Sequence, residues 1–326
     1  MRIQRRHALA LALAAAALGA FPAAAQTWPA RPITIVVSYP AGGDTDAVAR
    51  LFAEKLSARV GQPVVIDNRV GASGTIGNAY VGKAAPDGYT LLLTPGTFAS
   101  APVVLKTGSG ASYDPVQGFT PIVQTGTVPL FLVASPQSGL ASVKDVVAAG
   151  KAKKPLVYGS PGTGSPMHFV GEMLNKAAGI DIAHAPYKGV APSVNDVLGN
   201  HIPLAWVPLG PVMPHIAGGK LVPLAVALPQ RSPLLPNVPS LAELGYKDID
   251  PMSWQGLLGP KGMSPDVVKA LNTHFNEILK MPDVVAKLAT FGTVSVGGEP
   301  ARLAQANAEA HTKYAKLVKD FGIQAD

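Results

Sequence analysis

The stretch ITIVVSYPAGGDTDAVAR, residues 33–50, decides the fold of this chain. Its β-branched run at 33–37 predicts a buried strand, and the residues PAGG at 40–43 predict a tight turn. The residues DTD at 44–46 are good helix N-caps, and the apolar residues that follow at helical spacing predict a helix. A strand, a glycine loop and a helix start in this order present backbone N–H groups to an anion. A plain turn that needs glycine for its geometry is the alternative.

The overall composition indicates a globular α/β protein. The chain has 326 residues, 48% of them hydrophobic and 14% charged, and its glycines and prolines are plentiful without any period. No disulfide is possible because there is no cysteine. Neither G-x-G-x-x-G nor G-x-x-x-x-G-K-[ST] occurs in the glycine loop, so a nucleotide is not the favoured anion.

The N-terminus has the pattern of a signal peptide. Basic residues at positions 2, 5 and 6 precede an apolar segment, 8–21, that is too short to span a membrane. Ala23-Ala24-Ala25 then offers an A-x-A cleavage site. We therefore expect residues 1–25 to be removed on export to the periplasm. An uncleaved amphipathic anchor is the alternative, and the twin-arginine route is possible because of Arg5-Arg6.

Charge and histidine spacing exclude several kinds of partner. The formal net charge of +7 is not gathered into a basic stripe with aromatic residues, so nucleic acid is not an expected partner. No two histidines form a tight pair for a metal, and H-E-x-x-H is absent. We therefore expect neither a metal nor another cofactor.

The first part of the chain predicts a parallel sheet. Strands are expected at 64–67 and 90–93, with a helix from 75 to 85 between them. Ligands in such sheets bind at the carboxyl ends of the strands. The loops Pro40–Gly43 and Thr94–Thr97 both lie at that edge.

The same arrangement occurs a second time. A strand is expected at 156–159, a second glycine- and serine-rich loop at 160–168, and a helix at 169–177. Strands at 123–133 and 221–228 are expected to cross between two lobes. We infer two α/β lobes, with 26–126 and 229–326 in the first and 127–228 in the second.

Hydroxyl groups at the lobe edges suit a carboxylate. Neutral donors beside backbone N–H groups are a typical way to hold an oxyanion. Tyr39, Tyr187 and Trp206 are candidates for a wall of the site, with core packing as the alternative for Tyr39 and Trp206. The candidate hydroxyl donors are Thr94, Thr97, Ser160, Thr163 and Ser165.

A secreted serine hydrolase is the competing interpretation. G-x-S-x-G is absent, but Ser165 and His168 have the spacing of a dyad on one helix face. We favour a simpler interpretation, in which Ser165 caps a helix and His168 packs in its first turn.

Taken in order, these stretches resemble a known family over essentially the whole mature chain. The chain is similar to the Bug-type solute receptors of tripartite tricarboxylate transporters. The matching stretches are 28–33, 39–50, 61–65, 68–71, 86–92, 158–168, 186–189, 219–221 and 235–239.

The resemblance implies the fold and function of a periplasmic receptor. The implied fold is a two-lobe α/β periplasmic binding protein of type II, a Venus flytrap with two hinge crossings. It implies no enzymatic activity, a small carboxylate as ligand, a membrane permease as partner, and a monomer. A sensor that docks on a signalling partner is a further alternative. The ligand-binding residues that it implies are Tyr39, Ala41, Gly42, Asp46, Ser160, Thr163, Gly164, Ser165 and Tyr187.

The chain departs from the family where the ligand is chosen. Phe98 and Ala101 stand where polar residues are common in relatives, and Trp206 adds an aromatic side chain near the edge of the second lobe. These departures argue against citrate and favour a more apolar or aromatic acid.

Overall fold

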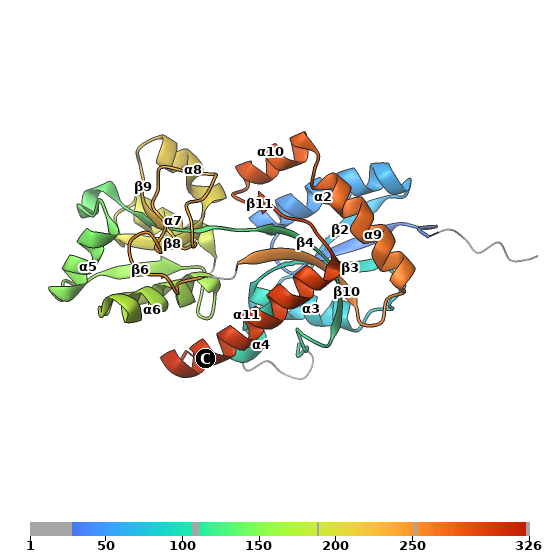
Figure 1. Cartoon of the computed structure of the whole chain (residues 1–326), viewed down its shortest axis with the longest axis horizontal. Helices are drawn as coiled ribbons and strands as arrows, with labels where there is room; N and C mark the ends of the chain where they lie inside the picture. The colour runs from blue at the N-terminus through green and yellow to red at the C-terminus, as the bar shows by residue number, and fades with distance from the viewer. Residues whose placement is uncertain (1–27, 106–110, 188, 251–252, 324–326) are drawn as a thin grey trace, which may run out of the picture.

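The computed structural model describes residues 28–105, 111–187, 189–250 and 253–323. It has two α/β lobes side by side, one around each of two sheets (Figure 1). The predicted signal peptide, 1–25, lies outside the described residues. We call the lobe with the six-stranded sheet the first lobe, and the lobe with the five-stranded sheet the second lobe.

Strand β1 (Ile33–Val37) shows why its run of residues is apolar throughout. Ile33, Ile35 and Val37 pack into a core on one face of the first sheet, and Val36 packs into a core on the other face. Both faces are covered by helices, so each position along the strand is buried or nearly so. Helices α2 (Asp44–Val60), α9 (Pro265–Ile278) and α10 (Pro282–Thr290) cover one face. Helices α3 (Thr75–Gly82), α4 (Thr97–Val104) and α11 (Pro300–Phe321) cover the other.

The first sheet is mixed. Its order is β11-β4-β10-β3-β1-β2, with β1 parallel to β2 and β3 as predicted. The sequence pattern did not predict β10 (Trp254–Pro260), which returns from the second lobe and pairs antiparallel with β3 and β4. The other elements of this lobe are α2 (Asp44–Val60), β2 (Val64–Asn68), α3 (Thr75–Gly82), β3 (Thr90–Pro95), α4 (Thr97–Val104), β4 (Phe119–Thr127), α9 (Pro265–Ile278), α10 (Pro282–Thr290), β11 (Val294–Ser295) and α11 (Pro300–Phe321).

The second lobe repeats the plan. Its sheet has the order β7-β6-β8-β5-β9, and β6 is parallel to β7 and β8. Its elements are β5 (Leu130–Ala134), α5 (Val143–Lys151), β6 (Val157–Ser160), α6 (Pro166–Ala178), β7 (Ala183–Pro186), α7 (Val190–Leu198), β8 (Leu204–Pro208), α8 (Leu209–Ala217) and β9 (Val222–Val226).

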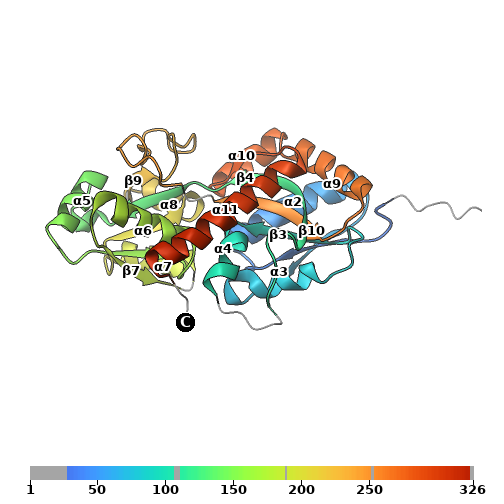
Figure 2. The same cartoon turned by 60° about the horizontal axis from the view of Figure 1, so that its bottom comes forward.

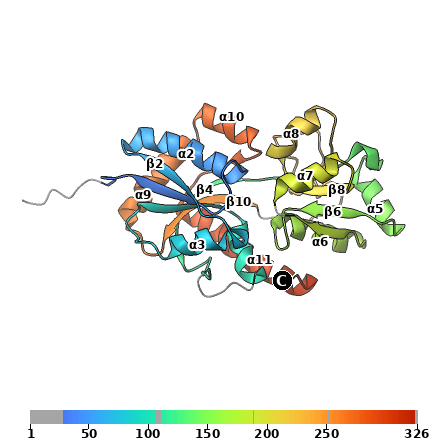
Figure 3. The ribbon, with the colours of Figure 1, turned by 180° about the vertical axis from the view of Figure 1, so that it is seen from behind.

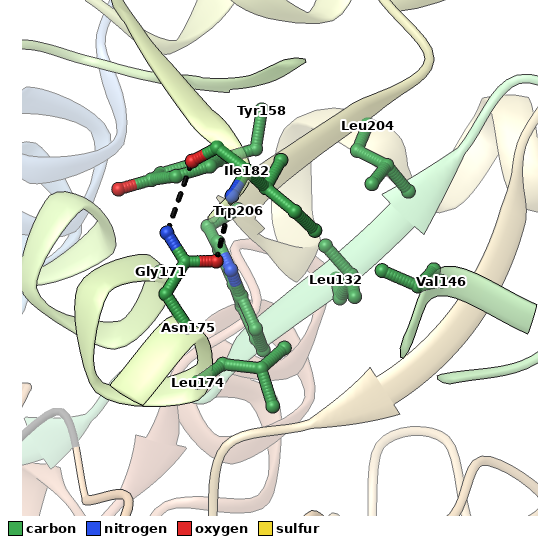
Figure 4. A pocket seen from close by; sticks show the side chains of 9 residues that line it. All are labelled: Leu132, Val146, Tyr158, Gly171, Leu174, Asn175, Ile182, Leu204 and Trp206. Carbon is green, nitrogen blue, oxygen red and sulfur yellow. Dashed lines mark hydrogen bonds between the residues drawn. The ribbon is translucent and has the colours of Figure 1, made fainter. Parts of the chain in front are cut away.

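Trp206 belongs to the core of the second lobe. It is 1% exposed and borders a cavity of about 10 Å³ between β8 and α6 (Figure 4). Beside this cavity the side-chain oxygen of Asn175 accepts the N–H of Ile182 at 3.2 Å, and the side-chain nitrogen of Asn175 donates to the Ile182 carbonyl at 3.0 Å. This bond pair ties the end of α6 to the segment before β7.

Two segments connect the lobes. The strand predicted at 123–133 is in fact two strands, because β4 ends at Thr127 and β5 begins at Leu130 in the other sheet. Between them Val128 donates its N–H to the carbonyl of Ser253 on the return segment at 2.9 Å, and the Ser253 hydroxyl donates back to the Val128 carbonyl. The two crossings therefore hold each other at the hinge.

Helix α11 makes a further connection between the lobes. It packs on α4 and β4 of the first lobe, and its last turns reach α6 of the second lobe (Figure 2). The rings of Tyr314 and Phe169 lie 4.8 Å apart, and Lys176 lies over the Phe321 ring at 5.3 Å. Across the parts of the chain with described coordinates, every helix is too short or too polar to cross a membrane.

Candidate functional site

The first glycine loop leads into α2 with a backbone cap. We predicted that a side chain in 44–46 caps this helix, and that prediction is wrong. Gly43 is the N-cap, no side chain bonds to the first turn from that position, and helical geometry begins at Asp44. The first N–H groups of a helix have no partner within the helix, so those of α2 are available to a ligand.

Asp46 holds the loop from inside. Its carboxylate is 3% exposed and accepts the N–H of Gly42 at 2.9 Å, the guanidinium of Arg50 at 2.8 Å and the side-chain amide of Asn68 at 2.9 Å. Burial raises the pKa of Asp46, but these three hydrogen bonds outweigh it and keep the pKa below its usual value. Asp46 therefore fixes the shape of the loop, while Ala41 and Gly42 are exposed.

Tyr39 and Thr97 lie together beside this loop. Thr97 is the first residue of α4, and its side chain lies within hydrogen-bonding reach of the Tyr39 hydroxyl. Burial raises the pKa of Tyr39 to about 12, so the hydroxyl stays protonated, and in this structure it donates to the Ser73 carbonyl at 3.4 Å. Gly96, the N-cap of α4, offers no side-chain cap to that helix either.

The second glycine loop is organised around Ser160. This residue is fully buried at the end of β6, and its hydroxyl lies 2.6 Å from Nε2 of His184 and accepts the N–H of Gly162 at 3.2 Å. The structure thus uses the Ser160 hydroxyl within the lobe. Thr163 and Ser165 remain half-buried at the loop surface.

Ser165 and His168 do not form a catalytic dyad. Ser165 is the N-cap of α6 and accepts the backbone N–H of His168 at 3.3 Å, while His168 Nδ1 accepts the N–H of Gly164 at 3.1 Å. The imidazole is therefore directed at the loop backbone and not at the Ser165 hydroxyl. This geometry contradicts the hydrolase interpretation for this pair and matches the capping role.

Tyr187 follows β7 and is bound on both sides. Its N–H donates to the carbonyl of Ser160 at 2.9 Å, and its hydroxyl donates to Asp196 of α7 at 2.6 Å. Burial first, then Asp196, raise the pKa of Tyr187 to about 12. The Tyr187 hydroxyl is therefore used to hold the loop segment onto α7.

Helix α4 brings the two loops to one part of the molecule. Thr97 at its start meets Tyr39, and Val104 at its end meets the second loop, where a Cβ on Gly164 would overlap the Val104 side chain. A helix of this length measures about 12 Å, so the loops are close neighbours. Seen from behind, the N-terminal end of α2 is the end nearest the second lobe (Figure 3).

Four residues lie in cores: Thr94, which was predicted as a hydroxyl donor of the site, and the three residues that the sequence linked to ligand choice. Thr94 is fully buried within β3, so its hydroxyl is not presented at the loop. Phe98 stacks on Tyr113 and lies edge-on to Phe119 in the core beneath α11, and Ala101 is buried on the same helix. Trp206 is also in a core, so these residues give no reason to expect an apolar or aromatic acid as the ligand.

His184 and Asn68 also shape the loops, and the sequence pattern did not predict either of them. His184 reaches Ser160 from β7, and Asn68 bonds Asp46 and the Tyr39 carbonyl from β2. Neither has a local signal, because each meets its partner through strand pairing. The Asp46–Arg50 pair, in contrast, has the i, i+4 spacing that a helix makes visible in sequence.

A hollow of about 220 Å³ lies at the hinge and is separate from the loops. It lies between the two crossings and α11, so none of the predicted site residues borders it. Its lining residues are Gln124, Thr127, Val128, Leu228, Asp250, Ser253, Trp254, Ala306 and Glu309.

Several known proteins are similar to this chain. Protein BugT of Bordetella pertussis is 36% identical over 94% of each chain. The structure of the periplasmic binding protein BugD has a TM-score of 0.80 at 32% identity, covering 92% of this chain and all of that one. The R. palustris protein Rpa4515 with adipate has a TM-score of 0.82 at 34% identity, covering 91% and 99%.

A third solved structure, MatC from Rhodopseudomonas palustris with bound malate, has a TM-score of 0.78 at 28% identity, covering 89% of this chain and all of that one. These likenesses confirm the two-lobe periplasmic binding protein fold, and the relatives are solute-binding receptors and not enzymes. The model of the tripartite tricarboxylate transporter family receptor, TctC, matches residues 48–323. The chain therefore belongs to the TctC family of tripartite tricarboxylate transporter receptors.

Proposed function

We propose that this protein is a periplasmic receptor that captures a small carboxylate between its two glycine loops. The ligand would bind the N–H groups at the start of α2, the Tyr39 and Thr97 hydroxyls, and the loop of Gly162–Ser165. Only a ligand that contacts both lobes favours the closed arrangement of the lobes, so capture and closure are coupled. Export through cleavage after residue 25 and delivery to a membrane permease are part of the same proposal.

The uncapped starts of α2 and α4 are the observation that carries the proposal. The N-cap residue of each helix is a glycine, Gly43 or Gly96, which has no side chain to bond the N–H groups of the first turn. Helix N-termini without an internal cap favour an anion there, at about 0.3 to 1 kcal/mol each near a surface. Two solved relatives, with adipate and with malate, support a carboxylate as the class of ligand.

The test is calorimetry with a panel of dicarboxylates, monocarboxylates and amino acids, starting from adipate and malate. A ligand at 100 times its Kd should also stabilise the fold by about 2.7 kcal/mol, which a thermal melt detects. We expect Tyr39→Phe to weaken binding about 3- to 10-fold, because it removes one neutral donor.

Tyr80→Phe is the matched control. Tyr80 lies on the outer side of α3, 42% exposed under the Arg69 guanidinium, and the same hydroxyl is removed there without touching the loops. It should leave the affinity unchanged. Absence of binding for every organic acid in the panel, or equal loss in both variants, would argue against the proposed site.

The proposal also includes a monomer in solution. The boundary predicted at 228 is wrong, because β9 stays in the second sheet and Val238, Leu241 and Ile249 pack in the cores of the second lobe. The chain returns to the first lobe at Ser253. The interpretation of the protein as a sensor with a signalling partner stays a prediction, and pull-down with the loaded protein distinguishes it from delivery to a permease.

A further inference from the structure

Both glycine loops are anchored by the same device. In each, a glycine with positive φ lies two residues before the helix, and the third helical residue accepts its N–H. In the first lobe Gly42 donates to Asp46, and in the second lobe Gly164 donates to His168 Nδ1. The two acceptors differ in charge, because Asp46 is a carboxylate paired with Arg50 whereas His168 is an imidazole.

The bond to Gly164 fixes the protonation of His168. A backbone N–H only donates, so Nδ1 must accept and the ring proton of neutral His168 lies on Nε2. With a proton on Nδ1, the ring N–H and the Gly164 N–H would both be donors, and the hydrogen bond that holds Gly164 would be lost. The anchor therefore works only with the neutral ring.

The surroundings of the ring keep it neutral. His184 of β7 stacks on His168 with centroids 3.8 Å apart. Glu172 of α6 is the charged group that faces the ring, with Oε1 3.9 Å from Nε2, and this carboxylate also accepts the Tyr158 hydroxyl of β6 at 2.6 Å. Burial, and then His184, lower the pKa of His168 to about 3, and burial lowers the pKa of His184 to about 4.

We propose that His168 is a positioning residue for ligand capture, whose neutral ring holds the Gly164 peptide and so sets the shape of the loop Gly162–Ser165. This inference rests on the proposed function, because that loop is the second-lobe half of the proposed site. Through His168 the second lobe gains the same anchor that Asp46 gives the first lobe, without a negative charge beside an anionic ligand.

Two variants at this position separate the anchor from simple packing. In His168→Asn the side-chain oxygen occupies the same place along the chain as Nδ1 and can accept the Gly164 N–H. In His168→Leu no acceptor remains. The first readout is the hydrogen-exchange protection of the Gly164 amide by NMR in ligand-free protein, and the second is the affinity for adipate by calorimetry.

We expect the Gly164 protection and the adipate affinity of His168→Asn to stay within about 3-fold of the wild-type values. In His168→Leu both the protection and the affinity should fall about 10-fold. If His168→Leu fails to fold, Gly164 protection measured over a pH series tests whether the neutral His168 ring is the anchor. The wild type should lose Gly164 protection as the pH falls through about 4 to 3, while His168→Asn keeps it. The amide of Leu132 in the core of the same lobe reports general unfolding.

Equal affinity in His168→Leu and the wild type overturns the proposal, as does equal loss in both variants. Loss of Gly164 protection without loss of affinity also overturns it. If the wild type binds no adipate, that result counts against the proposed function, and Gly164 protection in the ligand-free variants still decides whether His168 is the anchor.

Discussion

Asp44 and Asp46 lie two residues apart at the start of α2 and have opposite environments. Hydrogen bonds from Arg50, Gly42 and Asn68 keep the pKa of Asp46 low despite its burial. Burial alone raises the pKa of half-buried Asp44 to about 6. Folding therefore favours the ionised form of Asp46 and the protonated form of Asp44.

Asp44→Asn is expected to stabilise the protein at neutral pH. The folded protein holds the Asp44 proton more tightly than the unfolded chain, so ionisation of this group lowers the free energy of unfolding as the pH rises from about 4 to about 6. At a pH near 7.5 the free energy of unfolding of the variant should exceed that of the wild type by about 1 kcal/mol, after allowance for solvent screening. This corresponds to a rise of about 2 °C in Tm.

At a pH of about 2.5, well below the unfolded-state pKa of 3.8, the Asp44 carboxyl is protonated in both states, and the same variant should match the wild type in thermal melts. A variant that melts lower than the wild type at neutral pH would show that ionised Asp44 is favourably placed, through the positive end of α2.

At the scale of elements, α4 sets the distance between the loops. Val104 at the end of this helix lies against Gly164, whose φ of +75° also requires a residue without a Cβ. The residue is thus constrained twice, by the backbone and by the neighbouring lobe. The sequence pattern left residues 97–104 unassigned, because the helix contains Pro102 and lacks polar residues at regular spacing.

Gly164→Ala is expected to weaken both stability and ligand binding. The strained φ costs about 1 to 2 kcal/mol, and the overlap with Val104 holds the lobes apart. Adding Val104→Ala removes both Val104 methyl groups but leaves its Cβ, which lies 2.8 Å from the position of the new Cβ. The double variant should therefore recover part of the ligand affinity and keep the backbone strain, which calorimetry and chemical denaturation measure separately. If the double variant binds no better than Gly164→Ala, contact with α4 does not limit closure.

At the scale of the whole molecule, the lobes meet at more places than the hinge. The start of α8 in the second lobe approaches the turn at Phe291–Gly292 in the first, since a Cβ on Gly210 would lie 2.6 Å from the Phe291 carbonyl oxygen. On another side, α11 carries Leu317 and Phe321 onto the core of the second lobe. Opening of the lobes therefore has to break or bend the contact of α11 with α6.

Phe321→Ala is expected to favour the open arrangement of the lobes. The ring packs on both cores and against Lys176, so its loss removes apolar contact worth about 1 to 2 kcal/mol at this half-buried position. Small-angle scattering should report a larger radius of gyration without ligand. Val285→Ala, at an exposed position on α10, is the control. An unchanged radius would mean that α11 moves with the second lobe.

The sequence by itself determined the local elements and their order. The strands predicted at 33–37, 64–67 and 90–93 lie within two residues of those bounds, because each depends on residues next to one another in the chain. The same holds for the two glycine loops, whose turn residues are contiguous.

Only the tertiary structure decided which hydroxyls and rings are left for a ligand. Thr94, Phe98 and Trp206 are polar or aromatic residues at loop edges in the sequence, yet strand pairing and helix packing enclose all three. His184 of β7 stacks on His168 of α6, and β10 enters the first sheet from the second lobe. Contacts between distant segments depend on how sheets and helices pack. They cannot be predicted from hydropathy along the chain, because hydropathy describes only neighbouring residues.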